Sequence, residues 1–154
     1  FIMLSFSTIF QIRNDFNQVY FQILFIGIIC ISTDIGGYIF GKLIKGPKLT
    51  KLSPNKTYAG AIGGFLFSII ITILFFELTS KIYDYKYTEE TFIFVLAVSL
   101  VSQIGDIIIS YFKRLFKVKD TGNIIPGHGG ILDRIDGMIF AFPFSYIIFL
   151  IWNF

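Results

Sequence analysis

The stretch of residues 110–136 gathers most of the side chains in this sequence that could carry out phosphate or metal chemistry. These side chains are Lys113, Arg114, Lys117, Lys119, Asp120, His128, Asp133, Arg134 and Asp136. Lysine and arginine neutralise phosphate oxygens, and carboxylates are ligands for hard divalent cations. The stretch lies between two segments that are apolar enough to be membrane helices. We therefore expect chemistry at a bilayer surface on a charged, phosphate-bearing substrate.

A glycine-rich turn precedes the last two carboxylates of this stretch. The glycines are Gly127, Gly129 and Gly130. They free the backbone to direct several N–H groups towards an anion, and His128 between them could donate to a phosphate. Asp133 and Asp136 are three residues apart at the predicted start of the last helix, so both can face the same way. Asp133 could be a helix cap, but the nearby lysines and arginines favour a magnesium site.

The composition places the chain in a bilayer. Of the 154 residues, 55% are hydrophobic and only 15% are charged, whereas a soluble domain carries roughly 25% charged residues. Four segments have the length of a span, and they are residues 19–40, 57–79, 91–112 and 135–154. Residues 1–12 are apolar but too short. We expect an all-α, polytopic membrane helix bundle with four full spans plus a truncated N-terminal one. We expect it to form one domain over residues 1–154 and to be the C-terminal portion of a longer protein whose upstream helices are missing.

The charges of the loops predict the orientation. The loop of residues 41–56 carries five lysines and no acid, whereas the loop of residues 80–90 carries two lysines and three acids. The positive-inside rule makes the first loop cytoplasmic and the second external. The 110–136 stretch is then cytoplasmic too. The lysines of the first loop have two interpretations: substrate binding, or topology and contact with anionic lipid alone.

Two carboxylates lie inside predicted spans, where ionisable groups are costly and by default indicate function. Asp34 and Asp106 are each about two turns from the cytoplasmic end of their span. Asp106 belongs to a stripe along one helix face, which consists of Ser99, Gln103, Asp106, Ser110 and Lys113. The stripe must line a protein interior or a wet cavity. Ser99 and Gln103 could be only an interhelical hydrogen-bond seam, but Asp106 needs a metal ion, a lysine or an arginine as its partner.

Two pairs of glycines have the spacing that lets membrane helices approach closely. Gly37 and Gly41 form one pair, and Gly60 and Gly64 form the other. Cys30 is the only cysteine, so an intrachain disulfide is excluded. We expect it to be a small, apolar residue inside the first full helix.

The 110–136 stretch resembles the signature of the CDP-diacylglycerol synthases, or phosphatidate cytidylyltransferases. The matching residues are Ser110, Lys113, Arg114, Lys119, Asp120, Gly122, Pro126, His128, Gly129, Gly130, Asp133, Arg134 and Asp136. Residues 34–41 and 53–60 also resemble segments of this family. Ala59 stands where the family usually has Glu, and Ile109 stands where an acidic residue is common.

The resemblance implies magnesium-dependent transfer of the cytidylyl group from CTP to phosphatidic acid. The residues expected to be catalytic are Asp106, Asp133, Lys113, Arg114 and His128, of which Asp106 and Asp133 would bind Mg²⁺. The residues expected to bind substrate are Asp34, Ser53, Lys56, Thr57, Ser110, Lys119, Asp120, Gly129, Gly130, Arg134 and Asp136. The expected partners are CTP, phosphatidic acid and the lipid bilayer, with no nucleic acid and with a homodimer left open.

Two alternatives stay open on the residues alone. A related CTP-dependent polyprenol kinase would transfer the γ-phosphoryl group instead and release CDP. An ion-coupled transporter would use Asp34 and Asp106 to relay ions through the bundle. Transport needs a polar path to the outer side, whereas the ionisable groups of this sequence cluster at the predicted cytoplasmic end.

Overall fold

The protein is all-helical in the part of the chain that the structure describes. The computed structural model describes residues 2–15, 19–50, 56–80, 88–118, 121–122, 130 and 132–152, without the side chains of residues 13–15, 19–20, 134 and 152. The helices are α1 (Ile2–Asp15), α2 (Val19–Ile44), α3 (Tyr58–Thr79), α4 (Glu89–Leu115), α5 (Leu132–Ile135) and α6 (Met138–Trp152). The all-α prediction is confirmed for these residues.

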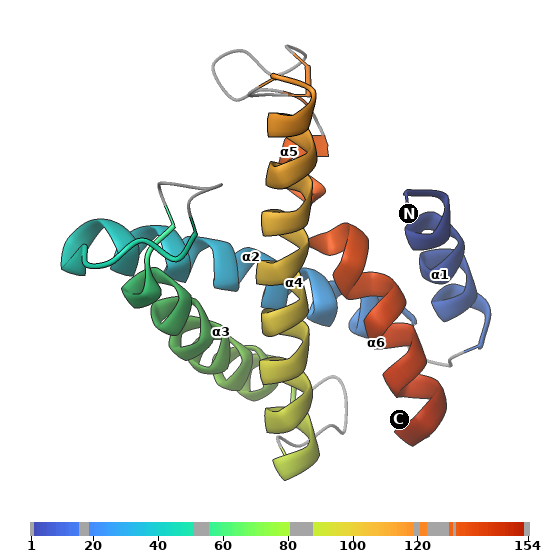
Figure 1. The fold of residues 1–154 in the computed structure, drawn as a ribbon. Helices are drawn as coiled ribbons and strands as arrows, with labels where there is room; N and C mark the ends of the chain where they lie inside the picture. The colour runs from blue at the N-terminus through green and yellow to red at the C-terminus, as the bar shows by residue number, and fades with distance from the viewer. Residues whose placement is uncertain are drawn as a thin grey trace.

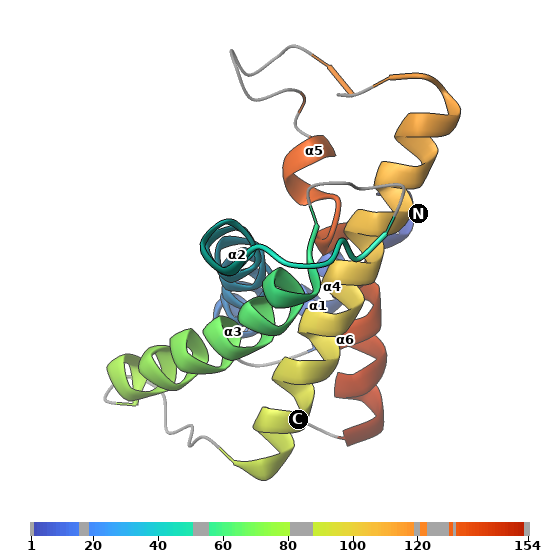
Figure 2. The same ribbon diagram turned by 60° about the vertical axis from the view of Figure 1, so that its left-hand side comes forward.

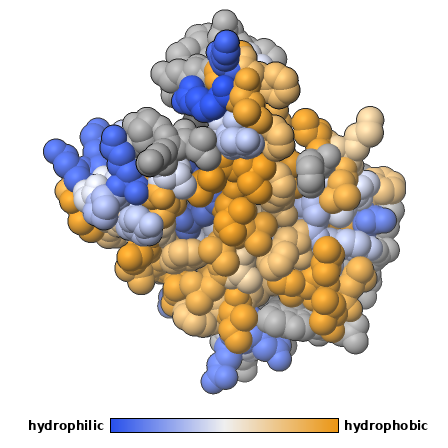
Figure 3. All heavy atoms as spheres, in the orientation of Figure 1, coloured by the Kyte–Doolittle hydropathy of each residue, from blue (hydrophilic) through white to orange (hydrophobic). Residues whose placement is uncertain are grey.

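Three of the helices are long and apolar enough to cross a membrane: Phe21–Ile44 within α2, and all of α3 and α4. Two shorter apolar segments, Ile2–Ile12 and Met138–Ile151, belong to α1 and α6. The first three predicted spans therefore meet the length requirement, while α6 has 15 residues against the roughly 20 that a span needs. Hydrophobic side chains cover the middle of the face in Figure 3, and hydrophilic ones gather towards its upper and lower ends.

The last helix begins later than the sequence suggests, and this corrects one prediction. Residues 135–154 were expected to form one helix with Asp133 and Asp136 at its start. Instead, Asp133 lies in the four-residue α5, and a turn at Asp136 and Gly137 separates α5 from α6. The Gly137 N–H donates to the Asp136 carboxylate at 2.9 Å. Gly137 also packs so tightly on Ser102 of α4 that a Cβ would clash with the serine hydroxyl, and this contact fixes the turn against α4.

Helices α2 and α3 pack side by side through glycines, as the spacing predicted. A Cβ placed on Gly36 would lie 2.5 Å from Phe67 Cβ and 2.8 Å from the Gly63 carbonyl oxygen. A Cβ on Gly60 would lie 2.7 Å from the carbonyl oxygen of Gly37. Such distances leave no room for any side chain, so these glycines set how closely the two backbones approach.

Helix α4 contacts α2, α3 and α6. Helices α2 and α3 cross it, α6 packs beside it, and α1 lies beyond α6 (Figures 1 and 2). An aromatic core joins α2, α3, α4 and α6, with ring centroids 5.5 Å apart for Phe25 and Phe94 and 5.1 Å apart for Phe94 and Phe149. Cys30 is buried at the end of this core, as expected. The core occupies the first half of α2, and the carboxylate of Asp34 lies in its second half.

Candidate active site

Four segments that are separated in the sequence meet in one open cavity of about 380 Å³. Its lining consists of Thr33, Asp34, Gly37, Tyr38, Leu49, Lys56, Thr57, Gly60, Ala61, Gln103, Asp106, Asp133 and Asp136. These residues come from α2, the segment before α3, the start of α3, the middle of α4, and α5 with the turn that follows it. Four carboxylates and one lysine therefore share a single cavity.

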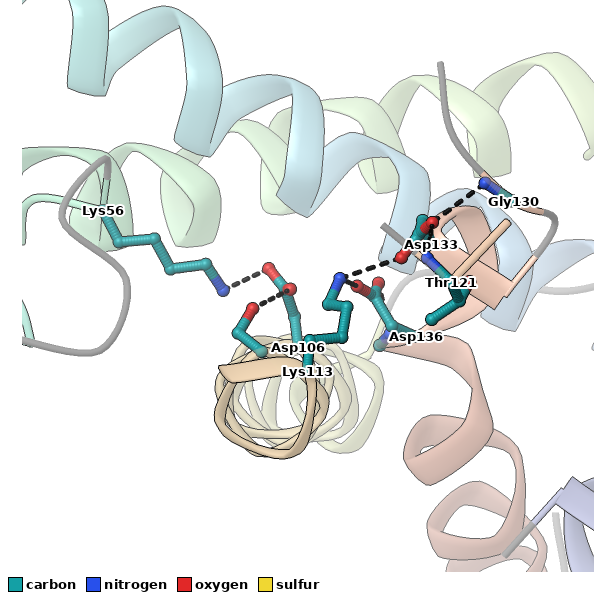
Figure 4. Close-up of polar contacts among 9 residues, drawn as sticks. Lys56, Asp106, Lys113, Thr121, Gly130, Asp133 and Asp136 are labelled. Atoms are coloured by element: carbon teal, nitrogen blue, oxygen red, sulfur yellow. Dashed lines mark hydrogen bonds and ion pairs between the residues drawn. The ribbon is translucent and has the colours of Figure 1, made fainter. Parts of the chain in front are cut away.

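Asp106 is paired with Lys56 across the cavity. The Lys56 ammonium forms an ion pair with Asp106 Oδ2, and the Ser110 hydroxyl donates to Oδ1 of the same carboxylate at 3.4 Å (Figure 4). Lys56 reaches this position because the next residue, Thr57, caps α3 by accepting from the Gly60 N–H at 3.1 Å. Asp34, which is exposed to the cavity, interacts electrostatically with both Asp106 and Lys56.

Lys113 connects the end of α4 to the two carboxylates near α5. Its ammonium lies 3.0 Å from Asp133 Oδ1 and 3.8 Å from Asp136 Oδ2. The side chains of all three residues are largely buried, with exposed fractions of 14% for Lys113, 10% for Asp133 and 11% for Asp136. In Figure 4 the Lys113 side chain points away from α4 towards this pair. Lys113 thus neutralises two carboxylates that would otherwise repel each other.

Asp133 also accepts hydrogen bonds from two other positions of the 110–136 stretch. Its Oδ2 accepts from the backbone N–H of Thr121 at 2.8 Å and of Gly130 at 2.9 Å. Burial alone would raise the pKa of this carboxyl, but the hydrogen bonds from Thr121, Gly130 and Lys113 outweigh it and lower the pKa to about 2. Asp133 is therefore fully ionised at neutral pH.

Asp136 is in a different electrostatic environment. Burial, and then the charge and hydrogen bonding of the neighbouring Asp106, raise its pKa to about 7, although the Gly137 N–H and Lys113 act in the opposite direction. Asp133 and Asp136 are only three residues apart, yet the pKa of the first is lowered and that of the second is raised. Such contrasts are typical of functional sites.

Removing the Asp133 carboxylate should loosen the chain at Thr121 and Gly130. In Asp133→Ala, we expect the amide protons of these two residues to exchange with solvent about 10-fold faster or more, because each loses a charge-assisted hydrogen bond. Hydrogen–deuterium exchange of peptides containing residues 121 and 130 measures this. Peptides from α3 are the internal control and should not change. Equal protection of residues 121 and 130 in the variant and the parent would contradict the role of Asp133.

The stripe on α4 lines the protein interior and the cavity, as predicted. The Thr33 hydroxyl on α2 donates to Ser99 Oγ at 2.8 Å, and Gln103 Nε2 donates to the Ala61 carbonyl oxygen on α3 at 3.4 Å. Ser99 and Gln103 thus form an interhelical hydrogen-bond seam, which is one of the roles considered for them from the sequence. The seam holds Asp106 in register with Asp34 and Lys56. Thr33 was missed as a positioning residue, although it directly precedes Asp34.

The structure brings together many of the predicted site residues. Those in or beside the cavity are Asp34, Lys56, Thr57, Asp106, Ser110, Lys113, Gly130, Asp133 and Asp136. Ser53, Lys119, Asp120, His128 and Gly129 lie outside the described residues, as does the side chain of Arg134. Arg114 is exposed at the end of α4. The sequence also gave no role to Tyr38 or Leu49, which line the cavity.

The donor set of the cavity suits magnesium. Oxygen atoms are the ligands that Mg²⁺ prefers, and it typically takes one or two carboxylates together with substrate phosphates and water. Within the described ranges no three His, Cys, Asp or Glu side chains converge closely enough to enclose an ion. Two ammonium groups already lie against these carboxylates. The site thus fits an ion shared between the protein and a phosphate-bearing substrate.

Three helices that are long and apolar enough to cross a membrane, with a polar cavity between them, are the architecture of a membrane protein. The sequence profile of the cytidylyltransferase family matches residues 1–152. The chain therefore belongs to the cytidylyltransferase family.

Curated relatives agree with this family. A Rickettsia bellii protein is 39% identical over 150 residues, which are 95% of this chain and 62% of the relative. A Bacillus subtilis protein is 35% identical over 154 residues, 99% of this chain and 56% of the relative. A Staphylococcus aureus protein is 41% identical over 132 residues, 83% of this chain and 48% of the relative. All three are named phosphatidate cytidylyltransferase. The chain spans about half to three fifths of their length.

Proposed function

We propose that this protein transfers the cytidylyl group of CTP to phosphatidic acid, giving CDP-diacylglycerol and pyrophosphate in phospholipid biosynthesis. The observation that carries the proposal is the convergence of Asp34, Lys56, Asp106, Asp133 and Asp136 in one cavity. Four of these residues, all except Asp106, lie in the three segments that resemble the family, and Asp106 lies on α4 just before the 110–136 stretch. The name phosphatidate cytidylyltransferase, which the three relatives share, supports the same reaction.

In the proposed reaction, a phosphate oxygen of phosphatidic acid attacks the α-phosphorus of CTP in line. The new bond joins the lipid phosphate to the α-phosphorus, and the bond to the β-phosphate oxygen breaks, with its electron pair leaving on pyrophosphate. Catalysis of this kind depends on positioning and on neutralising charge. Lys56 and Lys113 are placed to do this within the cavity. Arg114, Lys119, His128 and Arg134 are further candidates for contacts with the phosphates and the lipid headgroup.

Magnesium would be held by Asp106 and Asp133, with Asp136 as an additional ligand. When bound, the ion would neutralise charge on the CTP phosphates and on the departing pyrophosphate. The chain prepares these ligands in different ways. Asp133 is kept ionised by backbone hydrogen bonds, and Asp106 is oriented by Ser110 and by the seam on α4.

The proposed placement has the cavity opening to the cytoplasm and α6 as a fourth span. The lysine-rich segment before α3 and the basic end of α4 both border the cavity side of the molecule, in agreement with the positive-inside rule. CTP is then available on the side from which the cavity opens. The 15 residues of α6 would cross only with local thinning of the bilayer or with flanking residues reaching its surface.

A product assay tests the proposed function. Purified protein with Mg²⁺, labelled CTP and phosphatidic acid in mixed micelles should give CDP-diacylglycerol and an equal amount of pyrophosphate. Chelation with EDTA should stop the reaction, and excess Mg²⁺ should restore it. Release of CDP with a phosphorylated lipid would favour a kinase instead. The absence of any CTP-dependent lipid product would overturn the proposal.

A further inference from the structure

The carboxylates of Asp106 on α4, Asp133 on α5 and Asp136 in the turn after α5 share one pattern of contacts with the chain and with lysines, and Asp136 in addition interacts with Asp106. In each, one oxygen is held by the chain itself: Asp106 by Ser110, Asp133 by the N–H groups of Thr121 and Gly130, and Asp136 by the N–H of Gly137. In each, the other oxygen faces a lysine ammonium group. That lysine is Lys56 for Asp106 and Lys113 for Asp133 and Asp136.

This division means that the lysines are not needed to orient the carboxylates. If Lys113 moved away, Asp133 Oδ2 would keep its two backbone hydrogen bonds of 2.8 and 2.9 Å. If Lys56 moved away, Asp106 Oδ1 would keep Ser110. Lysine carries its charge on a flexible four-carbon stem, so its ammonium can move several ångströms without a change in the backbone. Each lysine can therefore leave its carboxylate without disturbing the orientation of that carboxylate.

The charges of the cavity point the same way. Among the described side chains, four carboxylates, including that of Asp34, share the cavity region with the two ammonium groups of Lys56 and Lys113. Carboxylate oxygens of this kind can bind a further cation. A divalent ion on the outward-facing oxygens would compete directly with both lysines, since two cations cannot share one carboxylate oxygen without repulsion.

We propose that Lys56 and Lys113 are exchangeable counter-ions of this site. They neutralise the carboxylates while the site is empty. When a divalent ion arrives with the nucleotide, they leave the carboxylate oxygens and their ammonium groups bind the nucleotide's phosphates. This inference rests on the proposed function for the identity of the nucleotide, but not for the exchange of cations at the carboxylates. It makes the two lysines competitors of the metal and partners of the nucleotide.

Two binding measurements on one variant test the exchange, because they should change in opposite directions. In Lys56→Met, Mn²⁺ titrated without nucleotide and detected by electron paramagnetic resonance should bind about 5-fold more tightly, since the competing ammonium is gone. CTP binding in the presence of Mg²⁺ should weaken about 10-fold, since a charge-assisted contact is lost. A purely structural role for Lys56 would weaken both.

Two further variants are the controls. Lys56→Arg keeps the charge and should bind Mn²⁺ within about 2-fold of the parent. Lys45→Met removes a lysine that is exposed just beyond the end of α2, and it should leave Mn²⁺ affinity unchanged. Unchanged or weaker Mn²⁺ binding in Lys56→Met would overturn the exchange. Tighter Mn²⁺ binding with unchanged CTP binding would overturn the transfer of Lys56 to the phosphates. If the parent binds Mn²⁺ but no CTP, the proposed function fails while the Mn²⁺ comparison still decides the exchange.

Discussion

Asp106→Asn should lower CTP-dependent formation of CDP-diacylglycerol about 100-fold or more. The substitution keeps the shape of the side chain and its hydrogen bond with Ser110, but removes the negative charge that pairs with Lys56 and would bind Mg²⁺. Loss of one electrostatic element of a preorganised site typically costs about 10²–10³-fold in rate. The measurement is the initial rate of lipid product formation at saturating CTP and Mg²⁺.

Glu77→Gln is the matched control for this prediction. It also converts a carboxylate to an amide, but Glu77 is exposed near the far end of α3, away from the cavity. Its rate should stay within about 2-fold of the parent, as is usual for surface substitutions. A rate for Asp106→Asn close to that of Glu77→Gln would refute the role of Asp106 in binding the metal.

Gly36→Ala should destabilise the protein and lower its activity together. The new Cβ would lie 2.5 Å from Phe67 Cβ and 2.8 Å from the Gly63 carbonyl oxygen, and the backbone of α3 cannot yield without moving the whole helix. Overpacking of this kind costs about 1–3 kcal/mol. The displacement of α3 should also separate Lys56 from Asp34 and Asp106, because Lys56 precedes the first turn of α3. Thermal unfolding in detergent and the rate of product formation measure the two effects.

Gly27→Ala is the matched control, since it lies on the same helix and a Cβ there would meet nothing within 4 Å. It should be neutral or slightly stabilising, because alanine has the higher helix propensity. If Gly36→Ala were as stable and active as Gly27→Ala, the close approach of α2 and α3 would not be what positions the site.

The helical elements follow directly from the sequence because the length of an apolar segment is a local property. Helices α2, α3 and α4 correspond to the first three predicted spans, and Thr57, the first residue of the second predicted span, caps α3. The prediction of where the last helix starts was wrong because that position depends on a contact between residues that are distant in the sequence. Gly137 packs on Ser102 of α4, which divides the predicted helix into α5, a turn and α6.

The sequence by itself determined which residues could do chemistry here. The spacing of the α4 stripe requires those side chains to share one helix face, and the cost of burying a carboxylate in a bilayer requires Asp106 to have a partner. The tertiary structure decided which partner it has. Lys56 and Asp106 are 50 positions apart, so their ion pair depends on how α2, α3 and α4 cross, which no local pattern encodes. The tertiary structure also places Lys113, Thr121 and Gly130 as hydrogen-bond donors around Asp133, and it places Lys113 next to two carboxylates. Such partners depend on distance in space and not on distance along the sequence.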